Sequence, residues 1–295
     1  MPSATTILQF IVLGLLVGGV YALMGAGLSL LYGVSRILNF AHGTIFALGA
    51  YAYYYMATTI LSPWLALFLV VPLGFAIGSL IYWPLLTPVT RGSLQRPNDY
   101  MIVITIALAV AIEKGIILTQ GAETLRPPSL IEGSLNFAGL DIAMDRIVGF
   151  IGAAVLVGLL ALVVRFTSIG RVWRAMAQNP LGAEVVGIDR QRSAWLAFAV
   201  ASALATAAGA FLAPLLLIYP AVGTSAIVKG FAIIVIGGLG SVWGACLGGL
   251  TLGLVEALGT GLFYPGLRDV YMVALMLLVL LFVPNGLFGE RVRNV

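Results

Sequence analysis

Eight long apolar runs divide this chain, and they limit its fold more than any other feature. A helix needs about 20 apolar residues to cross a hydrocarbon core of about 30 Å. The runs cover residues 7–31, 37–60, 64–86, 100–119, 147–164, 193–218, 227–258 and 270–288. Only 9% of the 295 residues are charged, whereas a soluble domain carries about 25%. We therefore expect an all-α, polytopic helical membrane protein with a single domain over residues 1–295.

Three absences in the sequence argue against catalysis. Cys246 is the only cysteine, so the chain can form no internal disulfide and no cysteine metal cluster. His42 is the only histidine, which leaves little for a histidine metal site or a Ser/His/Asp triad. No glycine is followed by lysine, so the G-x-x-x-x-G-K-[ST] phosphate loop is missing. We expect no enzyme and no cofactor bound by this chain, and an ATP-driven step needs a separate subunit.

The basic residues indicate which loops face the cytoplasm. The net charge of +4 fits a positive-inside bias of the loops better than a nucleic-acid surface. If the first six runs cross in turn, one side of the membrane receives Arg36, Arg91, Arg96 and the five arginines of residues 165–192. The other side receives the N-terminus and residues 121–145, a loop without a basic excess. The arginine-rich side is therefore expected to be cytoplasmic.

Glycines interrupt the seventh apolar run with the sequence G-G-L-G-S at residues 237–241. Each glycine costs a helix interior about 1 kcal/mol relative to alanine. Broken helices at membrane depth occur where protein or a cavity satisfies the backbone. We expect this run to be broken and to return to the side where it began, which places Arg291 and Arg293 in the cytoplasm.

Small residues recur at helical spacing in several runs. Such stripes let helix backbones approach closely. In the sixth run they fill every fourth position from Ala197 to Ala213. They predict tight packing within one bundle, with a dedicated dimer interface as the alternative. Pairs of glycines separated by three residues occur at Gly14 and Gly18, Gly74 and Gly78, Gly244 and Gly248, and Gly249 and Gly253.

Few ionisable side chains fall inside the runs. Glu113 and Lys114 lie near the outer end of the fourth run. We expect an interfacial role for them and no direct pairing, because neighbours on a helix point about 100° apart. Glu256 lies near the end of the seventh run, and its expected role is a structural contact with a basic residue such as Arg268, with substrate binding as the alternative. Ion-coupled transporters carry ionisable groups at the midplane of several helices. Only Glu113, Lys114, Lys229 and Glu256 come close, and all lie toward the ends of their runs, so the pattern argues against such a transporter.

A polar sequence, Asn39-Phe40-Ala41-His42-Gly43, lies at the start of the second run. Asn39 fits a helix N-cap and Gly43 permits close backbone approach. The sequence is either a capped, slightly broken helix or part of a transport path, since broken helices line midplane sites in transporters. On the second interpretation the candidate path residues are Asn39, His42, Gly43, Gly237, Gly238 and Gly240.

One polar segment, residues 165–192, contains an apolar stripe of its own. Asn179 followed by Pro180 is typical of a helix start. So short a helix needs a surface to pack on, which is either the lipid headgroup layer or a groove in a cytoplasmic protein. Its expected apolar face, at spacing i, i+4 and i+7, consists of Leu181, Val185 and Ile188.

Three blocks of the sequence resemble a known transporter family. Residues 170–189, GRVWRAMAQNPLGAEVVGID, resemble the cytoplasmic coupling loop of ABC-importer permeases that serve a binding protein. Two further blocks resemble recurrent blocks of LivH-type branched-chain amino-acid permeases: GVSRILNFAHGTIFALGAY at residues 33–51 and GFAIIVIGGLGSVWGACLGGLTLGLVEAL at residues 230–258. The blocks occur in the expected order, and the resemblance covers nearly the whole chain.

The resemblance implies a translocation subunit in the bacterial inner membrane. The implied partners are a second permease of similar sequence, two cytoplasmic ATPase subunits that bind ATP and Mg, and a periplasmic substrate-binding protein. The implied cargo is a branched-chain or related amino acid; urea or a short amide is one alternative, and an ion-coupled transporter or channel is another. By analogy, the residues that contact an ATPase are Arg171, Arg174, Asn179, Pro180, Leu181, Glu184, Val185, Gly187 and Ile188.

Overall fold

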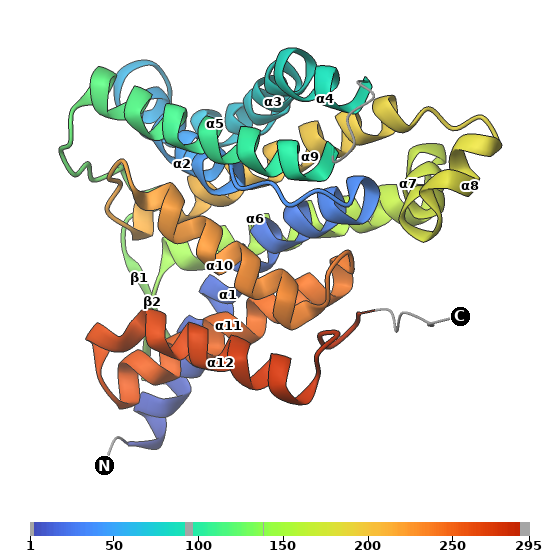
Figure 1. The fold of residues 1–295 in the computed structure, drawn as a ribbon. Helices are drawn as coiled ribbons and strands as arrows, with labels where there is room; N and C mark the ends of the chain where they lie inside the picture. The colour runs from blue at the N-terminus through green and yellow to red at the C-terminus, as the bar shows by residue number, and fades with distance from the viewer. Residues whose placement is uncertain (1–2, 92–96, 138, 290–295) are drawn as a thin grey trace.

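The computed structural model describes residues 3–91, 97–137 and 139–289, most of them helical (Figure 1). Seven helical stretches of the described residues are long and apolar enough to span a membrane, and α10 is a shorter apolar helix. The expected all-α polytopic fold is confirmed. In chain order the helices are α1 (Ala4–Ser35), α2 (His42–Tyr55), α3 (Pro63–Ile81), α4 (Thr87–Arg91), α5 (Pro97–Gln120), α6 (Met144–Phe166), α7 (Ser168–Gln178), α8 (Pro180–Val185), α9 (Arg190–Leu212), α10 (Val222–Gly237), α11 (Val242–Leu262) and α12 (Arg268–Phe282).

Helix α9 lies at the centre of the bundle and packs through its small residues. Of the residues in its most apolar stretch, 89% are buried. A Cβ atom at Gly209 would collide with the carbonyl oxygen of Phe46 in α2. A Cβ atom at Gly74 in α3 would collide with Thr206 of α9. The predicted stripe is therefore a packing surface within this chain, because its Gly209 touches the backbone of α2 and its Ala201 O would lie 3.1 Å from a Cβ atom at Gly27 of α1, whereas α3 packs on the neighbouring face of α9.

The glycine pairs of α1 and α11 bring these two helices together in the same way. A Cβ atom at Gly14 would lie 2.8 Å from Gly253 O, and one at Gly18 would lie 3.0 Å from Gly249 O. Both separations are shorter than ordinary van der Waals contact, so these positions accept only glycine at this helix spacing. The pairs thus support packing within the bundle, as the sequence predicts.

The seventh apolar run forms two antiparallel helices, α10 and α11, joined by residues 238–241. Gly238 (φ 103°) and Gly240 (φ 84°) have backbone conformations that favour glycine. A Cβ atom at Gly237 would collide with the carbonyl of Gly244, and one at Gly248 would contact Ile233 O at 2.5 Å, so the two helices touch along their backbones. The predicted break is confirmed, and its two halves run in opposite directions.

The residues after α12 return to the end of the bundle where α10 stops. Leu287 N donates to Ile236 O and Phe288 N donates to Gly237 O, both at 2.9 Å. The turn between α10 and α11 lies against the end of α1, because a Cβ atom at Gly33 would be 3.2 Å from Gly240 O. This end carries the residues expected to be cytoplasmic. Three arginines used in the orientation argument, Arg96, Arg291 and Arg293, lie outside the described residues.

The second apolar run and the acidic loop differ from the expected pattern. The helix of the second run begins only at His42, and a π-helical turn, Met56–Ile60, extends it. The loop after α5 contains an antiparallel hairpin of β1 (Ser134–Phe137) and β2 (Leu140–Ala143), which the apolar pattern did not indicate. Asp145 Oδ1 fixes this loop against α6 by accepting N–H groups at residues 130 and 131, at 2.9 and 3.2 Å.

Candidate functional site

The predicted coupling segment, residues 165–192, forms α7, α8 and the start of α9 at one edge of the bundle (Figure 1). Buried side chains attach it to the membrane helices. Trp173 is 3% exposed and donates from Nε1 to Ser193 O at 3.2 Å, and Met176 is fully buried. A buried tryptophan that also makes a hydrogen bond fixes both the position and the rotation of its helix. The inner face of α7 is therefore held firmly.

Two arginines connect the coupling segment to neighbouring helix ends. Arg174 Nη1 donates to the carbonyl oxygens of Val164 and Arg165, which end α6. Arg36 follows α1 directly and donates from Nη2 to Ala177 O near the end of α7. The last carbonyls of a helix lack partners within it and form the negative end of its dipole, so both contacts are favourable. The guanidinium of Arg174 is thus engaged within the chain, and its contact with an ATPase stays a prediction.

The start of α8 agrees with the sequence pattern. Asn179 Oδ1 accepts the Gly182 N–H at 2.9 Å, and Pro180 takes the first helical position. Glu184 pairs with Arg190 at 3.4 Å, and both side chains are well exposed. An exposed pair of this kind contributes about 1 kcal/mol or less. The Asn179 cap and Pro180, rather than the exposed ion pair, therefore fix where this helix begins.

The end of α8 corrects the predicted apolar face. The helix stops in a Schellman motif: the Ile188 N–H bonds to Ala183 O, and the N–H of Gly187, whose φ is 87°, bonds to Glu184 O, each at 3.0 Å. Ile188 therefore lies beyond the helix and packs, half-buried, against the core. The sequence pattern missed this because a left-handed residue at Gly187 ends the 3.6-residue period.

The exposed apolar surface of α8 consists of Leu181, Val185 and Val186, which are 72%, 86% and 76% exposed. We call these three residues the α8 patch. Arg171, on the neighbouring helix α7, is also exposed. Three large apolar side chains in water on one short helix cost free energy unless another surface covers them.

Asn39, His42 and Gly43 lie deep inside the bundle. Asn39 is 1% exposed and His42 is fully buried, with Nε2 3.2 Å from Met24 O in the middle of α1. The N-cap of α2 is Ala41, so Asn39 does not cap the helix; its Oδ1 accepts the Ala41 N–H at 3.0 Å instead. This local bond competes with helix formation and explains why α2 begins late.

The six candidate path residues fall in two separate places. A Cβ atom at Gly43 would collide with Gly223 O, so the starts of α2 and α10 meet inside the bundle. Gly237, Gly238 and Gly240 lie instead at the end of α1 beside Gly33. Since Met24 and Gly33 are nine residues apart in α1, the two places differ by about 14 Å along that helix. The structure does not bring the six residues together, and their role in transport stays a prediction.

A buried ionic cluster joins four helices. Glu256 of α11 accepts from Lys229 of α10 at 2.6 Å and also pairs with Arg268 at the start of α12. The hydroxyl of Tyr21 in α1 accepts from Lys229 at 2.9 Å and from Arg268 at 3.2 Å. The expected contact between Glu256 and Arg268 is present. Lys229 is one of the few ionisable residues of the apolar runs, but its pairing with Glu256 and the role of Tyr21 were not predicted, although a lysine in the middle of an apolar helix is itself a signal for a buried partner.

The pair near the outer end of α5 needs a correction. Lys114 Nζ lies 3.5 Å from Glu113 Oε1, so these neighbours do pair. The angle of about 100° separates the Cβ directions of neighbouring residues in a helix, whereas a long lysine side chain can bend back along the helix surface. Glu113 Oε2 also accepts from Thr224 Oγ1 at 3.0 Å, which links α5 to the start of α10.

Comparison with known proteins relates this sequence to a family of proteins. Residues 10–282 match the family described as branched-chain amino acid transport system / permease component. The chain is 30% identical to the high-affinity branched-chain amino acid transport system permease protein LivH of Escherichia coli, over 94% of each chain. It is also 30% identical to the corresponding protein BraD of Pseudomonas aeruginosa, over 98% of each chain.

Two further matches concern the partner subunit and the fold. The permease protein LivM of Escherichia coli is 26% identical over 91% of this chain and 67% of LivM. Since LivH and LivM are two permeases of one organism, these relatives indicate that a second permease subunit belongs to such systems. The structure of PsaBC from Streptococcus pneumoniae in complex with Fab has a TM-score of 0.52 and 9% identity, over 94% of this chain and 92% of that one. It supports the fold alone.

Proposed function

This chain belongs to the family of branched-chain amino acid transport permeases, and we propose that it imports branched-chain or related amino acids as the translocation subunit of a binding-protein-dependent ABC importer. It is a multi-pass protein of the inner membrane. The cargo proposal rests on the names of its relatives, LivH and BraD. The chain itself is not an enzyme in this scheme, and ATP and Mg bind to partner subunits.

The α8 patch is the observation that carries the proposed mechanism. It presents two exposed apolar side chains on a helix of six residues and a third, Val186, at the helix C-cap, and so short a helix is unstable without a partner surface. The inner side of the same segment is anchored through Trp173, Arg174 and Arg36. A surface that is apolar outside and rigidly held inside is suited to receive force from a cytoplasmic ATPase and pass it to α1, α6 and α9.

The remaining partners follow from the family. A second permease subunit completes the membrane part, two ATPase subunits dock from the cytoplasm, and a periplasmic substrate-binding protein delivers the cargo. Apart from the second permease, which the relatives indicate, these partners are part of the proposal.

A double variant tests the docking role. Leu181→Asp with Val185→Asp places charges at two exposed apolar positions that the proposed docking would bury, and burial of each such side chain is worth about 1.5–3 kcal/mol. We expect the affinity for the ATPase to fall by about a hundredfold or more, with loss of ATP-driven uptake in proteoliposomes. Leu135→Asp is the matched control, since Leu135 is 47% exposed in the β1 strand on the opposite side. Unchanged ATP-driven uptake by the double variant would refute the docking role.

Cargo is tested separately in a strain that lacks this gene. Uptake of leucine, isoleucine, valine, urea and a short amide is measured with and without the restored chain. We expect the branched-chain amino acids to be restored. Restoration of urea or amide uptake alone would overturn the cargo proposal and leave the docking role untouched.

The buried charges argue against an ion-coupled transporter. Lys229 and Glu256 are only 13% and 5% exposed and pair with each other at 2.6 Å, so their charges are compensated inside the bundle. An ion-driven cycle needs groups that gain and lose an ion during transport. Uptake that proceeds without ATP under an ion gradient would contradict this conclusion.

A further inference from the structure

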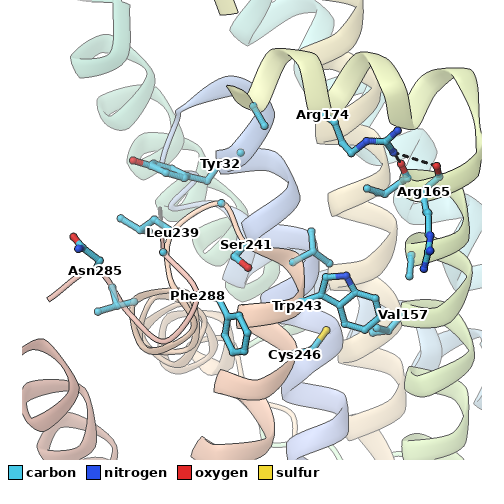
Figure 2. A pocket seen from close by; sticks show the side chains of 18 of the residues that line it. Tyr32, Val157, Arg165, Arg174, Leu239, Ser241, Trp243, Cys246, Asn285 and Phe288 are labelled. Carbon is cyan, nitrogen blue, oxygen red and sulfur yellow. Dashed lines mark hydrogen bonds between the residues drawn. The ribbon is translucent and has the colours of Figure 1, made fainter. Parts of the chain in front are cut away.

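A groove of about 1370 Å³ opens at the expected cytoplasmic end of the bundle (Figure 2). Its walls come from the ends of α1 and α6, the start of α11 and the residues after α12. Figure 2 shows Trp243 and Cys246 on one wall, Tyr32 and Phe288 on others, and Arg165 and Arg174 grouped beside α6 and α7. The groove is separate from the α8 patch, whose residues do not line it.

The charged side chains that line the groove are all cationic. They are Arg36, Arg165 and Arg174, and no acidic residue occurs among the lining residues that the structure describes. Arg174 and Arg36 each donate a hydrogen bond to a helix carbonyl. A guanidinium has five N–H donors and keeps its charge, so both can still bind an anion. Arg165 is exposed, lies 5.3 Å over the Phe166 ring, and has no carboxylate partner in the described part of the chain. An anion is therefore the complementary ligand.

The apolar part of the groove extends into the depth of the membrane. On α6 it runs from Arg165 to Val157, eight residues that correspond to about 12 Å along the helix. Trp243, 66% exposed, and Cys246 continue it along α11. A water-soluble protein does not reach apolar helix surface at this depth, whereas the acyl chain of a lipid lies there.

We propose that this groove binds an anionic phospholipid of the cytoplasmic leaflet. Its phosphate lies among Arg36, Arg165 and Arg174, and its acyl chains run along α6 and α11. The cytoplasmic leaflet is the source of anionic headgroups, and basic pockets between membrane helices bind them.

The lipid occupies a mechanically relevant position. Arg36 and Arg174 are the same side chains that attach α7 to the ends of α1 and α6. A bound phosphate adds the negative charge that the described lining of the groove lacks, so it stabilises the geometry of the coupling segment.

The experiment is native mass spectrometry of the full chain in detergent, with phosphatidylglycerol and phosphatidylcholine supplied at equal concentration. We expect selective retention of phosphatidylglycerol. Arg165→Gln removes the arginine whose guanidinium makes no polar contact in the described part of the chain, and it is expected to weaken retention about fivefold, the effect of one basic residue at a lipid surface. Arg192→Gln is the matched control, because Arg192 is an exposed arginine of the same segment that does not line the groove.

A second variant tests the apolar part without a change in charge. Gly158 lines the groove, and a Cβ atom there meets nothing within 4 Å, so Gly158→Trp places an indole ring in the groove from a position where the Cβ atom is accommodated. We expect this variant to lose retained phosphatidylglycerol while remaining folded. Equal retention of both lipids, an equal effect of Arg165→Gln and Arg192→Gln, or full lipid retention by Gly158→Trp would each overturn the proposal. Retention of inorganic phosphate as strong as that of phosphatidylglycerol would do the same.

Discussion

Replacing Glu256 by glutamine is expected to destabilise the bundle far more than the same change at an exposed glutamate. The Glu256 side chain is 5% exposed, and its carboxylate lies 2.6 Å from Nζ of Lys229, whose side chain is 13% exposed. Arg268 also contacts this carboxylate, but its side chain is 43% exposed, and water screens that charge. Glu256→Gln therefore leaves a buried lysine without a counter-charge.

The size of the effect follows from this geometry. At 2.6 Å and an effective dielectric constant of about 20, the two charges attract by about 6 kcal/mol before desolvation is subtracted. Removing one partner of a buried pair costs about 3–5 kcal/mol. We expect the lower end of this range, because Tyr21 still accepts a hydrogen bond from Lys229 at 2.9 Å. Glu184→Gln, at an exposed pair with Arg190, is expected to cost about 1 kcal/mol or less.

The assay is the free energy of unfolding, measured by titration of the purified chain with sodium dodecyl sulfate in mixed micelles. Adding Lys229→Met to Glu256→Gln removes the stranded charge, so the double variant should be more stable than Glu256→Gln alone. Equal costs for Glu256→Gln and Glu184→Gln would refute the reasoning. So would a double variant whose cost is the sum of its two single changes.

Three further changes test the fold by the same titration. Gly209→Ala places a Cβ atom against Phe46 O and should cost about 1–3 kcal/mol or more through overpacking; a stability equal to that of Gly158→Ala, where a Cβ meets nothing, would contradict the close helix contact. Asp145→Ala leaves two backbone N–H groups of the outer loop without their acceptor and should lower the free energy of unfolding by about 2–3 kcal/mol. An unchanged free energy of unfolding would show that the loop does not contribute to stability. Asn179→Ala removes the cap of α8 and should speed amide hydrogen exchange there, at a cost of about 1 kcal/mol, whereas unchanged exchange would show that the cap is dispensable.

Features that depend on local sequence could be predicted. The apolar runs, the break at residues 237–241 and the start of α8 at Asn179 and Pro180 each follow from neighbouring residues, because hydropathy, glycine conformation and capping act over a few positions. The end of α8 is also local, but periodicity alone does not register the Schellman motif at Gly187.

Features that depend on distant residues could not be predicted. Arg36 donates to the carbonyl of Ala177, and Lys229 donates to Tyr21, although these partners are far apart in sequence. The late start of α2 depends on the side chain of Asn39, whose competing bond the hydropathy pattern does not contain. For the candidate site, the surface of α8 was predictable in part, whereas the groove required the assembled ends of four segments.

Helix α1 makes contacts near both of its ends and in its middle, and so connects parts of the protein that are otherwise far apart. Near its outer end Gln9 donates to Asp141 O at 3.3 Å, in its middle Tyr21 joins the ionic cluster, and beyond its last residue Arg36 holds α7. Its 32 residues contain no proline and make it about 48 Å long. Such a rod is a lever: a tilt of about 1° at the cytoplasmic end displaces the outer end by about 0.8 Å. On the proposed docking role, a small rotation of residues 165–192 would therefore change hydrogen-bond distances at the other end of α1.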